Sequence, residues 1–227
     1  MTTLALFDLD HTLLPIDSDY EWGRYLVHRG LVDIAAFEAT NAIFFKQYQA
    51  GTLDSMEYLD FTLGTLARFP RTRLDALHAE FMRDVVNPAL LPSALALVRR
   101  HREAGDLVVI ATATNRFVTA PIARAFEVDH LLAAVPEEDA QGNLTGKLLG
   151  TPSMGAGKVT HLKGWLADTG RTLDHFERSY FYSDSHNDLP LLSIVTHPVA
   201  TNPNAILSAH AIAHGWPILQ LFNQTVQ

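Results

Sequence analysis

The chain has 227 residues, of which 48% are hydrophobic and 19% are charged, and it contains no cysteine. This composition excludes a disordered or fibrous protein, and the missing cysteines exclude disulfides, thiolate nucleophiles and zinc–thiolate sites. A net charge of −8 disfavours a nucleic-acid partner, because neutralising phosphates requires clustered lysine and arginine. For this length we expect one core fold that carries an inserted module.

The beginning of the chain and its apolar runs argue against a membrane protein. No run approaches the roughly 18 consecutive apolar residues of a membrane-spanning helix. The longest, residues 107–113, has the length of a strand. The first residues carry no basic leader, and their short apolar run meets an acid at Asp8, which is atypical of a signal peptide. We therefore expect a cytoplasmic protein with no membrane partner.

Residues 4–7 form a short apolar run that is typical of a buried parallel strand, and Asp8-Leu9-Asp10 follow it directly. The segment after this strand indicates helix after helix, with breaks at Gly51-Thr52, Phe69-Pro70 and Asn87-Pro88 that predict three or four helices. We expect its aromatic and apolar side chains to form a core of their own, because they recur at helical spacing: Trp22, Tyr25, Leu26, Phe37, Phe44, Phe45, Tyr48, Tyr58, Leu59 and Phe61.

Four more strand-like runs follow the inserted segment and alternate with helical stretches. The strands are predicted at residues 107–111, 131–135, 179–183 and 198–201, and the helices at 93–104, 117–126 and 159–167. This alternation predicts a doubly wound α/β fold whose parallel strands form one sheet. Residues 141–146 indicate a small hairpin.

The two aspartates after the first strand are the most informative feature for function. Asp8 and Asp10 would project from the same side of the strand into the crevice beyond the sheet, where α/β folds bind ligands. Two close carboxylates repel each other unless a cation or a shared proton lies between them. The pair therefore predicts a hard metal ion such as Mg²⁺, two different pKa values, or both.

A second acidic segment follows the strand at 179–183. If that strand lies beside the first, Asp184 would complete an oxygen cage for Mg²⁺, and Asn187 and Asp188 would support it from the loop.

Two further residues are expected at the same rim of the sheet. Thr112 follows the strand at 107–111 and offers a hydroxyl together with the backbone N–H groups after it. Lys158 opens a helix after Gly155-Ala156-Gly157 and offers an ammonium. Thr114 and Lys163 are the alternatives for these two positions.

In order and spacing, these residues resemble the four motifs of the haloacid dehalogenase superfamily of aspartate-nucleophile phosphotransferases. The chain is most similar to the phosphoserine-phosphatase-like subfamily IB, and the similarity covers nearly all of it. The matching positions are Asp8-Leu9-Asp10-His11-Thr12, Thr112, Lys158 and residues 184–188, with Asn202-Pro203 and Gly215-Trp216-Pro217 near the end. The resemblance implies a Rossmann-like parallel sheet in a core domain, residues 1–14 and 88–227, and an inserted α-helical cap domain, residues 15–87.

The resemblance also implies a phosphatase that works through an aspartyl phosphate. Asp8 would attack phosphorus and ligate Mg²⁺. Asp10 would protonate the leaving alkoxide, later deprotonate the hydrolytic water, and offer its backbone carbonyl to the metal. Thr112 and the N–H of Ala113 would hold phosphoryl oxygens, and Lys158 would offset the negative charge of Asp8 and phosphate.

The last motif would complete the site. Asp184 would bind the metal directly, and Asn187 and Asp188 would orient metal-bound waters and the lysine. His11 and His186 lie inside motifs at variable positions, and whether they line the pocket entrance is left open.

Asp10 separates functions within the superfamily. Dehalogenases lack the second aspartate, and the ATP-driven pumps carry a threonine there, so the resemblance favours a phosphatase or a phosphomutase. We expect hydrolysis of a small phosphomonoester and keep the phosphomutase as an alternative. A receiver-like phospho-accepting signalling module uses similar residues, but such modules have about half this length, and their phospho-acceptor lies on a different strand from the acid pair.

The resemblance also narrows the substrate. Phosphoserine phosphatases hold the substrate amine with a cap acid just after the first motif, and Asp17 falls at about that place. Their cap arginine for the substrate carboxylate has no match here, because the corresponding region holds Asp60 and Thr62, with no arginine before Arg68. An amine-bearing ester without a carboxylate, such as histidinol phosphate, is therefore expected ahead of phosphoserine. The sequence makes no prediction of the oligomeric state.

Overall fold

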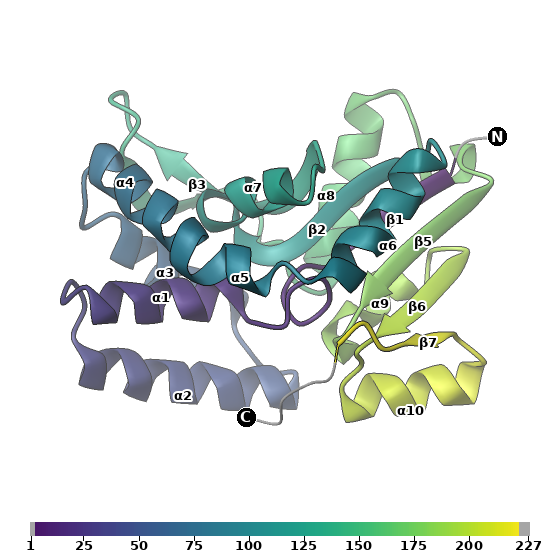
Figure 1. The fold of residues 1–227 in the computed structure, drawn as a ribbon, viewed down its shortest axis with the longest axis horizontal. Coiled ribbons are helices and arrows are strands. Elements are labelled where there is room, and N and C mark those ends of the chain that lie inside the picture. The colour runs from purple at the N-terminus through teal and green to yellow at the C-terminus, as the bar shows by residue number, and fades with distance from the viewer. Residues whose placement is uncertain (1–2, 223–227) are drawn as a thin grey trace.

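The computed structural model describes residues 3–222, and its centre is a seven-stranded sheet with the strand order β4-β3-β2-β1-β5-β6-β7 (Figure 1). Neighbouring strands run parallel except β3 and β4, which are antiparallel. The predicted α/β fold with parallel strands in one sheet is therefore confirmed, apart from this edge hairpin. The strands are β1 (Thr3–Phe7), β2 (Leu107–Asn115), β3 (His130–Glu138), β4 (Leu144–Leu149), β5 (Arg178–Ser183), β6 (His197–Thr201) and β7 (Ile218–Leu219).

Helices cover both faces of the sheet, because side chains of a strand alternate between its two faces. On β1, Ala5 and Phe7 belong to one apolar cluster, whereas Leu4 and Leu6 belong to the other. The first cluster includes side chains of α6 (Pro92–Glu103) and α7 (Arg116–Ala125), and the second includes side chains of α8 (Ala156–Asp168), α9 (Leu189–Leu192) and α10 (Ala205–His214).

The central position of β1 brings three strand ends together. Phe7 pairs with Ile110 on β2 and with Tyr182 on β5. Because parallel strands end at the same edge of a sheet, the segments that follow β1, β2 and β5 meet there. This topology, rather than any local motif, assembles the site described below.

Between β1 and β2 the chain forms the insert helices α1 (Ser18–His28), α2 (Ile34–Ala50), α3 (Ser55–Leu66), α4 (Arg71–Phe81) and α5 (Asn87–Ala89). The first three begin at an aspartate whose carboxylate accepts hydrogen bonds from backbone N–H groups of the first turn: Asp17, Asp33 and Asp54. Figure 1 shows α2 as the outermost of these helices.

Two predictions for this region are wrong. The chain is not broken at Asn87-Pro88, because the π-helical turn Met82–Val86 joins α4 to α5, and helical structure continues to Ala89. Pro88 lacks an N–H for an α-helical bond, and the π-helical pattern replaces the α-helical one in the turn before it. Phe45 is not part of an aromatic core either, since it is 61% exposed. It lies one residue beyond the buried Phe44 and so faces another side of α2.

The hairpin of β3 and β4 ties the far edge of the sheet to the insert helices. Gly146 on β4 approaches α3 so closely that a Cβ atom there would lie 3.1 Å from the Cβ of Ala67 and 3.4 Å from the Cα of Gly64. Its φ of 85° also favours glycine.

Within residues 3–222 no single helix is long and apolar enough to cross a membrane. One pair, Arg71–Ala89 with Pro92–Glu103, reaches that length and composition only across a bend of 92°.

Candidate active site

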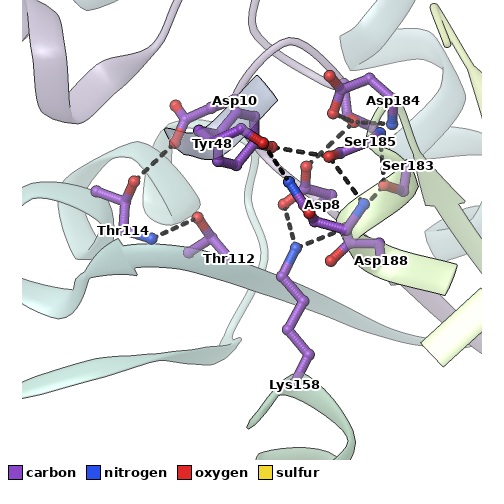
Figure 2. Close-up of polar contacts among 12 residues, drawn as sticks. Asp8, Asp10, Tyr48, Thr112, Thr114, Lys158, Ser183, Asp184, Ser185 and Asp188 are labelled. Carbon is purple, nitrogen blue, oxygen red and sulfur yellow. Dashed lines mark hydrogen bonds and ion pairs between the residues drawn. The ribbon is translucent and has the colours of Figure 1, made fainter. Parts of the chain in front are cut away.

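Asp8 and Lys158 form the centre of a buried polar cluster at the edge where β1 and β5 end. The N–H of Asp8 donates to the carbonyl oxygen of Tyr182 at 2.9 Å, so the backbone at Asp8 is still held by the sheet. Nζ of Lys158 lies 2.7 Å from Asp8 Oδ1 and 2.7 Å from Asp188 Oδ2 (Figure 2). Burial opposes the charge on Lys158, but Asp188 and Asp8 outweigh it and raise the pKa of this ammonium. Lys158 is therefore a fixed cation between two carboxylates.

The glycines before Lys158 explain how its helix reaches the site. Gly155 precedes α8 with φ 55° and ψ −120°, a backbone conformation that side chains other than glycine avoid. At Gly157 a Cβ atom would collide with the carbonyl oxygen of Pro152. Of the two predicted alternatives, Lys158 is the lysine that joins the cluster, whereas Lys163 is exposed.

Asp10 turns its carboxylate away from Lys158. Its Oδ1 accepts a hydrogen bond from the N–H of Ser18 at 2.8 Å, and its Oδ2 accepts one from the hydroxyl of Thr114 at 2.8 Å. Burial raises the pKa of Asp10 to about 8, and the negative charges of Asp17 and Asp8 raise it further. A carboxyl that titrates near neutral pH can both give and take a proton during a reaction. The two aspartates of the first motif thus lie in different surroundings.

Thr112 and Thr114, the two alternatives in the second motif, have different neighbours. Thr114 bonds Asp10, while Oγ1 of the buried Thr112 accepts the N–H of Thr114 at 3.2 Å. Within the described residues no hydrogen bond joins Thr112 to Asp8 or Lys158.

The backbone of this segment leaves the regular ladder with β3. Ala111 pairs with Leu132 but Asn115 pairs with Ala134, so four residues of β2 match two of β3. Residues 112–114 therefore form an irregularity of the bulge type, which leaves backbone groups without a strand partner. Ala113, whose N–H we expect to hold a phosphoryl oxygen, lies within it.

Thr12 links the first and last motifs, and its contacts were not predicted. Its Oγ1 lies 3.3 Å from Asp8 Oδ2 and 3.2 Å from Asp184 Oδ1, and it accepts the N–H of Asp184 at 3.0 Å. Burial raises the pKa of Asp184 well above its usual value, and the nearby charges of Asp8 and Asp188 add to this. Asp8 and Asp184 are thus two carboxylates held on either side of one hydroxyl.

Asp188 and Asn187 lie in the short 3₁₀ turn His186–Asp188, but only the first contacts Lys158. Asp188 also accepts the hydroxyl of Ser183 at 2.7 Å, and burial raises its pKa although Lys158 lowers it. The amide of Asn187 instead donates to the backbone oxygen of Tyr48 at 3.4 Å. The expectation that Asn187 orients the lysine is therefore wrong in this arrangement, because its side chain faces the insert helices.

Asp17 has a local task in addition to any task at the site. Its Oδ1 accepts the N–H groups of Asp19 and Tyr20, so it caps α1. The buried Asp19 beside it accepts the hydroxyl of Tyr58 at 2.8 Å and the amide of Asn115 at 3.2 Å. Burial raises the pKa of Asp19 to about 7, with a further contribution from Asp17. Tyr58 and Asn115 were not predicted at the site, since nothing in their spacing separates them from core residues.

The two histidines that were left open lie at the margin of the cluster. His11 is exposed and has a positive φ of 58°. His186 shares a hydrogen bond of 3.1 Å between its Nδ1 and the side-chain amide of Asn204.

A sequence model of the haloacid dehalogenase-like hydrolases matches residues 5–193. The chain belongs to this family. A histidinol-phosphatase of Neisseria meningitidis serogroup C is 44% identical over 96% of this chain and 99% of its own length. A solved structure of a protein with unknown function from Bordetella pertussis Tohama I is 49% identical, with a TM-score of 0.93, and the match covers 98% of this chain and all of the other.

A phosphoserine phosphatase, solved as a phospho-aspartyl intermediate analogue, shares the fold. It is 18% identical to this chain with a TM-score of 0.67, and the match covers 98% of this chain and 94% of the other. The haloacid dehalogenase-like family and its phosphatase relatives together identify the chain as a phosphoric monoester hydrolase.

The donor set of this haloacid dehalogenase-like site suits a hard cation only in part through side chains. Among residues 3–222 no three histidine, cysteine, aspartate or glutamate side chains are close enough to hold a metal ion alone. The carboxylate of Asp10 points to Ser18 and Thr114. Asp8 and Asp184, with main-chain oxygen and water, therefore form the set that fits Mg²⁺, which usually keeps several waters.

Negative charge dominates this region of the phosphatase. Over the described ranges, Lys158 is the residue that forms ion pairs with its acids. The acids are the buried Asp8, Asp19, Asp184 and Asp188, together with the partly exposed Asp10 and Asp17. A bound cation, or a substrate that carries positive charge, would relieve their mutual repulsion.

Proposed function

We propose that this phosphatase hydrolyses a small amine-bearing phosphomonoester, histidinol phosphate, through an aspartyl phosphate on Asp8 with Mg²⁺ as cofactor. One observation carries the proposal: the two aspartates of the first motif are held by different partners. Asp8 is joined to the cation of Lys158, whereas Asp10 is held by neutral donors and has a pKa of about 8. The first suits a nucleophile and the second a proton carrier.

In the first step, a carboxylate oxygen of Asp8 forms a bond to phosphorus while the bond from phosphorus to the ester oxygen breaks. Asp10 gives its proton to the departing alkoxide, so the alcohol leaves neutral. Lys158 offsets the charge that collects on Asp8 and the phosphoryl group. The hydroxyl of Thr112 and the N–H of Ala113, in the irregular end of β2, would hold phosphoryl oxygens.

In the second step, the ionised Asp10 takes a proton from water, and the water oxygen attacks phosphorus. The bond between phosphorus and Asp8 breaks, which releases inorganic phosphate and restores the carboxylate. Bound by Asp8, Asp184 and the backbone carbonyl of Asp10, Mg²⁺ would supply positive charge to the phosphoryl oxygens. Asp188 keeps Lys158 in place, since the two are 2.7 Å apart.

The charges around the site support a cationic substrate without a carboxylate. Asp17 remains our proposed partner for the substrate amine, because its capping bonds use Oδ1. Arg68, the arginine nearest in sequence to the expected carboxylate site, is exposed and lies against the ring of Phe69. The 44% identical relative named histidinol-phosphatase supports the same substrate.

The insert helices support a division into two domains. We propose that residues 15–87 form a cap over a core of residues 1–14 and 88–227, because Tyr48 and Tyr58 from the insert contact groups of the site. The hydrolase family and its phosphatase relatives favour hydrolysis over the phosphomutase and receiver-like alternatives.

The test is phosphate release by the purified chain with Mg²⁺ from histidinol phosphate, phosphoserine and p-nitrophenyl phosphate, run side by side. We expect the highest kcat/KM with histidinol phosphate. Equal or better use of phosphoserine would contradict the proposed substrate. No release from any of the three would contradict the phosphatase itself.

A further inference from the structure

Tyr48 belongs to the insert but touches the loop that carries the last motif. It lies near the end of α2, and its hydroxyl donates to Oγ of Ser185 at 2.8 Å (Figure 2). Ser185 separates β5 from the 3₁₀ turn His186–Asp188 and lies 137 residues away in the sequence. The contact therefore joins two parts of the chain that only the fold brings together.

A second set of contacts holds the same two segments together. The backbone oxygen of Tyr48 accepts the amide of Asn187 at 3.4 Å. Gly51, just after α2, has a φ of 68°, and a Cβ atom there would lie 3.6 Å from Nε2 of His186 and 3.7 Å from Oδ1 of Asn187. The end of α2 thus rests directly on the turn.

The atom that Tyr48 contacts is also the atom that begins this turn. Oγ of Ser185 accepts the N–H of Asn187 at 3.2 Å, and the backbone oxygen of Ser185 accepts the N–H of Asp188 at 3.1 Å. Asp184 precedes Ser185, and Asp188 ends the turn with its carboxylate on Lys158. The orientation of both carboxylates therefore depends on how Ser185 is held.

We propose that Tyr48 is a positioning residue, which fixes Ser185 and through it the arrangement of Asp184 and Asp188 around Lys158. The inference rests on the proposed function for its effect on turnover, but the contact itself does not. Tyr48 would make formation of the complete site depend on the insert lying against the core. A hydroxyl donor is needed for this task, so an aromatic ring alone does not replace it.

The experiment compares the full-length wild-type chain with Tyr48→Phe, Ser185→Ala and the double variant. Tyr20→Phe is the matched control, because it removes a hydroxyl from the same insert that bonds only the exposed Glu38. Hydrogen exchange of the backbone amides of residues 184–188 reports the loop without requiring activity. Calorimetric titration with magnesium chloride and the separate values of kcat and KM report the site.

We expect Tyr48→Phe to speed exchange in residues 184–188, to weaken Mg²⁺ binding and to lower kcat, each by about tenfold, with KM nearly unchanged. The double variant should be no worse than the more affected single variant, because both remove the same bond. Tyr20→Phe should match the wild type.

Wild-type exchange in residues 184–188 of Tyr48→Phe would overturn the inference, as would effects of the two substitutions that add. If Tyr48→Phe unfolds, Ser185→Ala carries the same expectation from the core side of the contact. If the wild type hydrolyses no phosphomonoester, the proposed function fails, and the exchange measurement still decides the role of Tyr48.

Discussion

Nζ of Lys158 lies 2.7 Å from Oδ1 of Asp8, although 150 residues separate the two in the sequence. Both side chains are buried, and Lys158 also holds Asp188. Attraction to the two carboxylates is what allows the lysine to remain charged in a buried place. The same pair gives the proposed nucleophile a fixed orientation and a compensating charge.

Replacing Lys158 by methionine should destabilise the fold, because Asp8 and Asp188 would be left buried without a cation. We expect the free energy of unfolding to fall by about 3 kcal/mol. Lys163→Met is the control on the same helix, where an exposed lysine should change the free energy by less than about 0.5 kcal/mol. Urea denaturation of both variants measures the difference, and equal stabilities would contradict the proposed balance of charge.

Replacing Asp8 by asparagine should abolish turnover and leave the chain folded. Asparagine has nearly the same shape but offers no carboxylate oxygen to phosphorus, and Lys158 keeps its bond to Asp188. Losing one of several close carboxylates also relieves repulsion with Asp184. Phosphate release and far-ultraviolet circular dichroism should be measured on the same sample. A folded variant that keeps more than about a tenth of the wild-type kcat would exclude Asp8 as the nucleophile.

The principal acids and the lysine could be predicted because their positions follow from chain order and strand direction. Asp8, Asp184 and Lys158 come after strand-like runs or before a helix, and strands β1 and β5 are neighbours that end at one edge. General rules of α/β folds bring such segments together. The parallel sheet was predictable for the same reason.

The remaining contacts depend on geometry that residue types do not encode. Tyr48 recurs at helical spacing like its neighbours in the insert core, so its contact with Ser185 could not be separated from ordinary packing. Thr114 reaches Asp10 because β2 becomes irregular after Ala111. Strand alternation alone does not reveal such an irregularity.

Replacing Thr114 by valine should impair proton transfer by Asp10. The substitution keeps the shape but removes the hydroxyl that donates to Asp10 Oδ2 at 2.8 Å. Because that bond favours the ionised carboxylate, its loss should raise the pKa of Asp10 further and slow the step in which Asp10 acts as a base. We expect kcat to fall about tenfold with little change in KM. Thr114→Ser, which retains the hydroxyl, should keep most of the activity, and equal loss in both variants would show that packing rather than the bond matters.

The stability of the metal-free protein should fall as the pH rises from about 6.5 to about 8.5. Burial raises the pKa of Asp10 to about 8 and that of Asp19 to about 7, compared with an ordinary value of 3.8. The folded protein therefore keeps protons that the unfolded chain has released, and the free energy of unfolding decreases with pH through both values. Buried His78 acts in the opposite direction, since its pKa is lowered by burial, but this effect is complete above its ordinary value of 6.5.

Urea denaturation at several pH values, with chelator and then with Mg²⁺, measures this dependence. Asp19→Asn is the matched variant: it removes one titrating group, so the slope between pH 6.5 and 8.5 should become shallower. Mg²⁺ prefers the ionised carboxylates and should stabilise the protein more at high pH than at low pH. A free energy of unfolding that stays level or increases over this range without metal would mean that these carboxyls are already ionised in the folded protein.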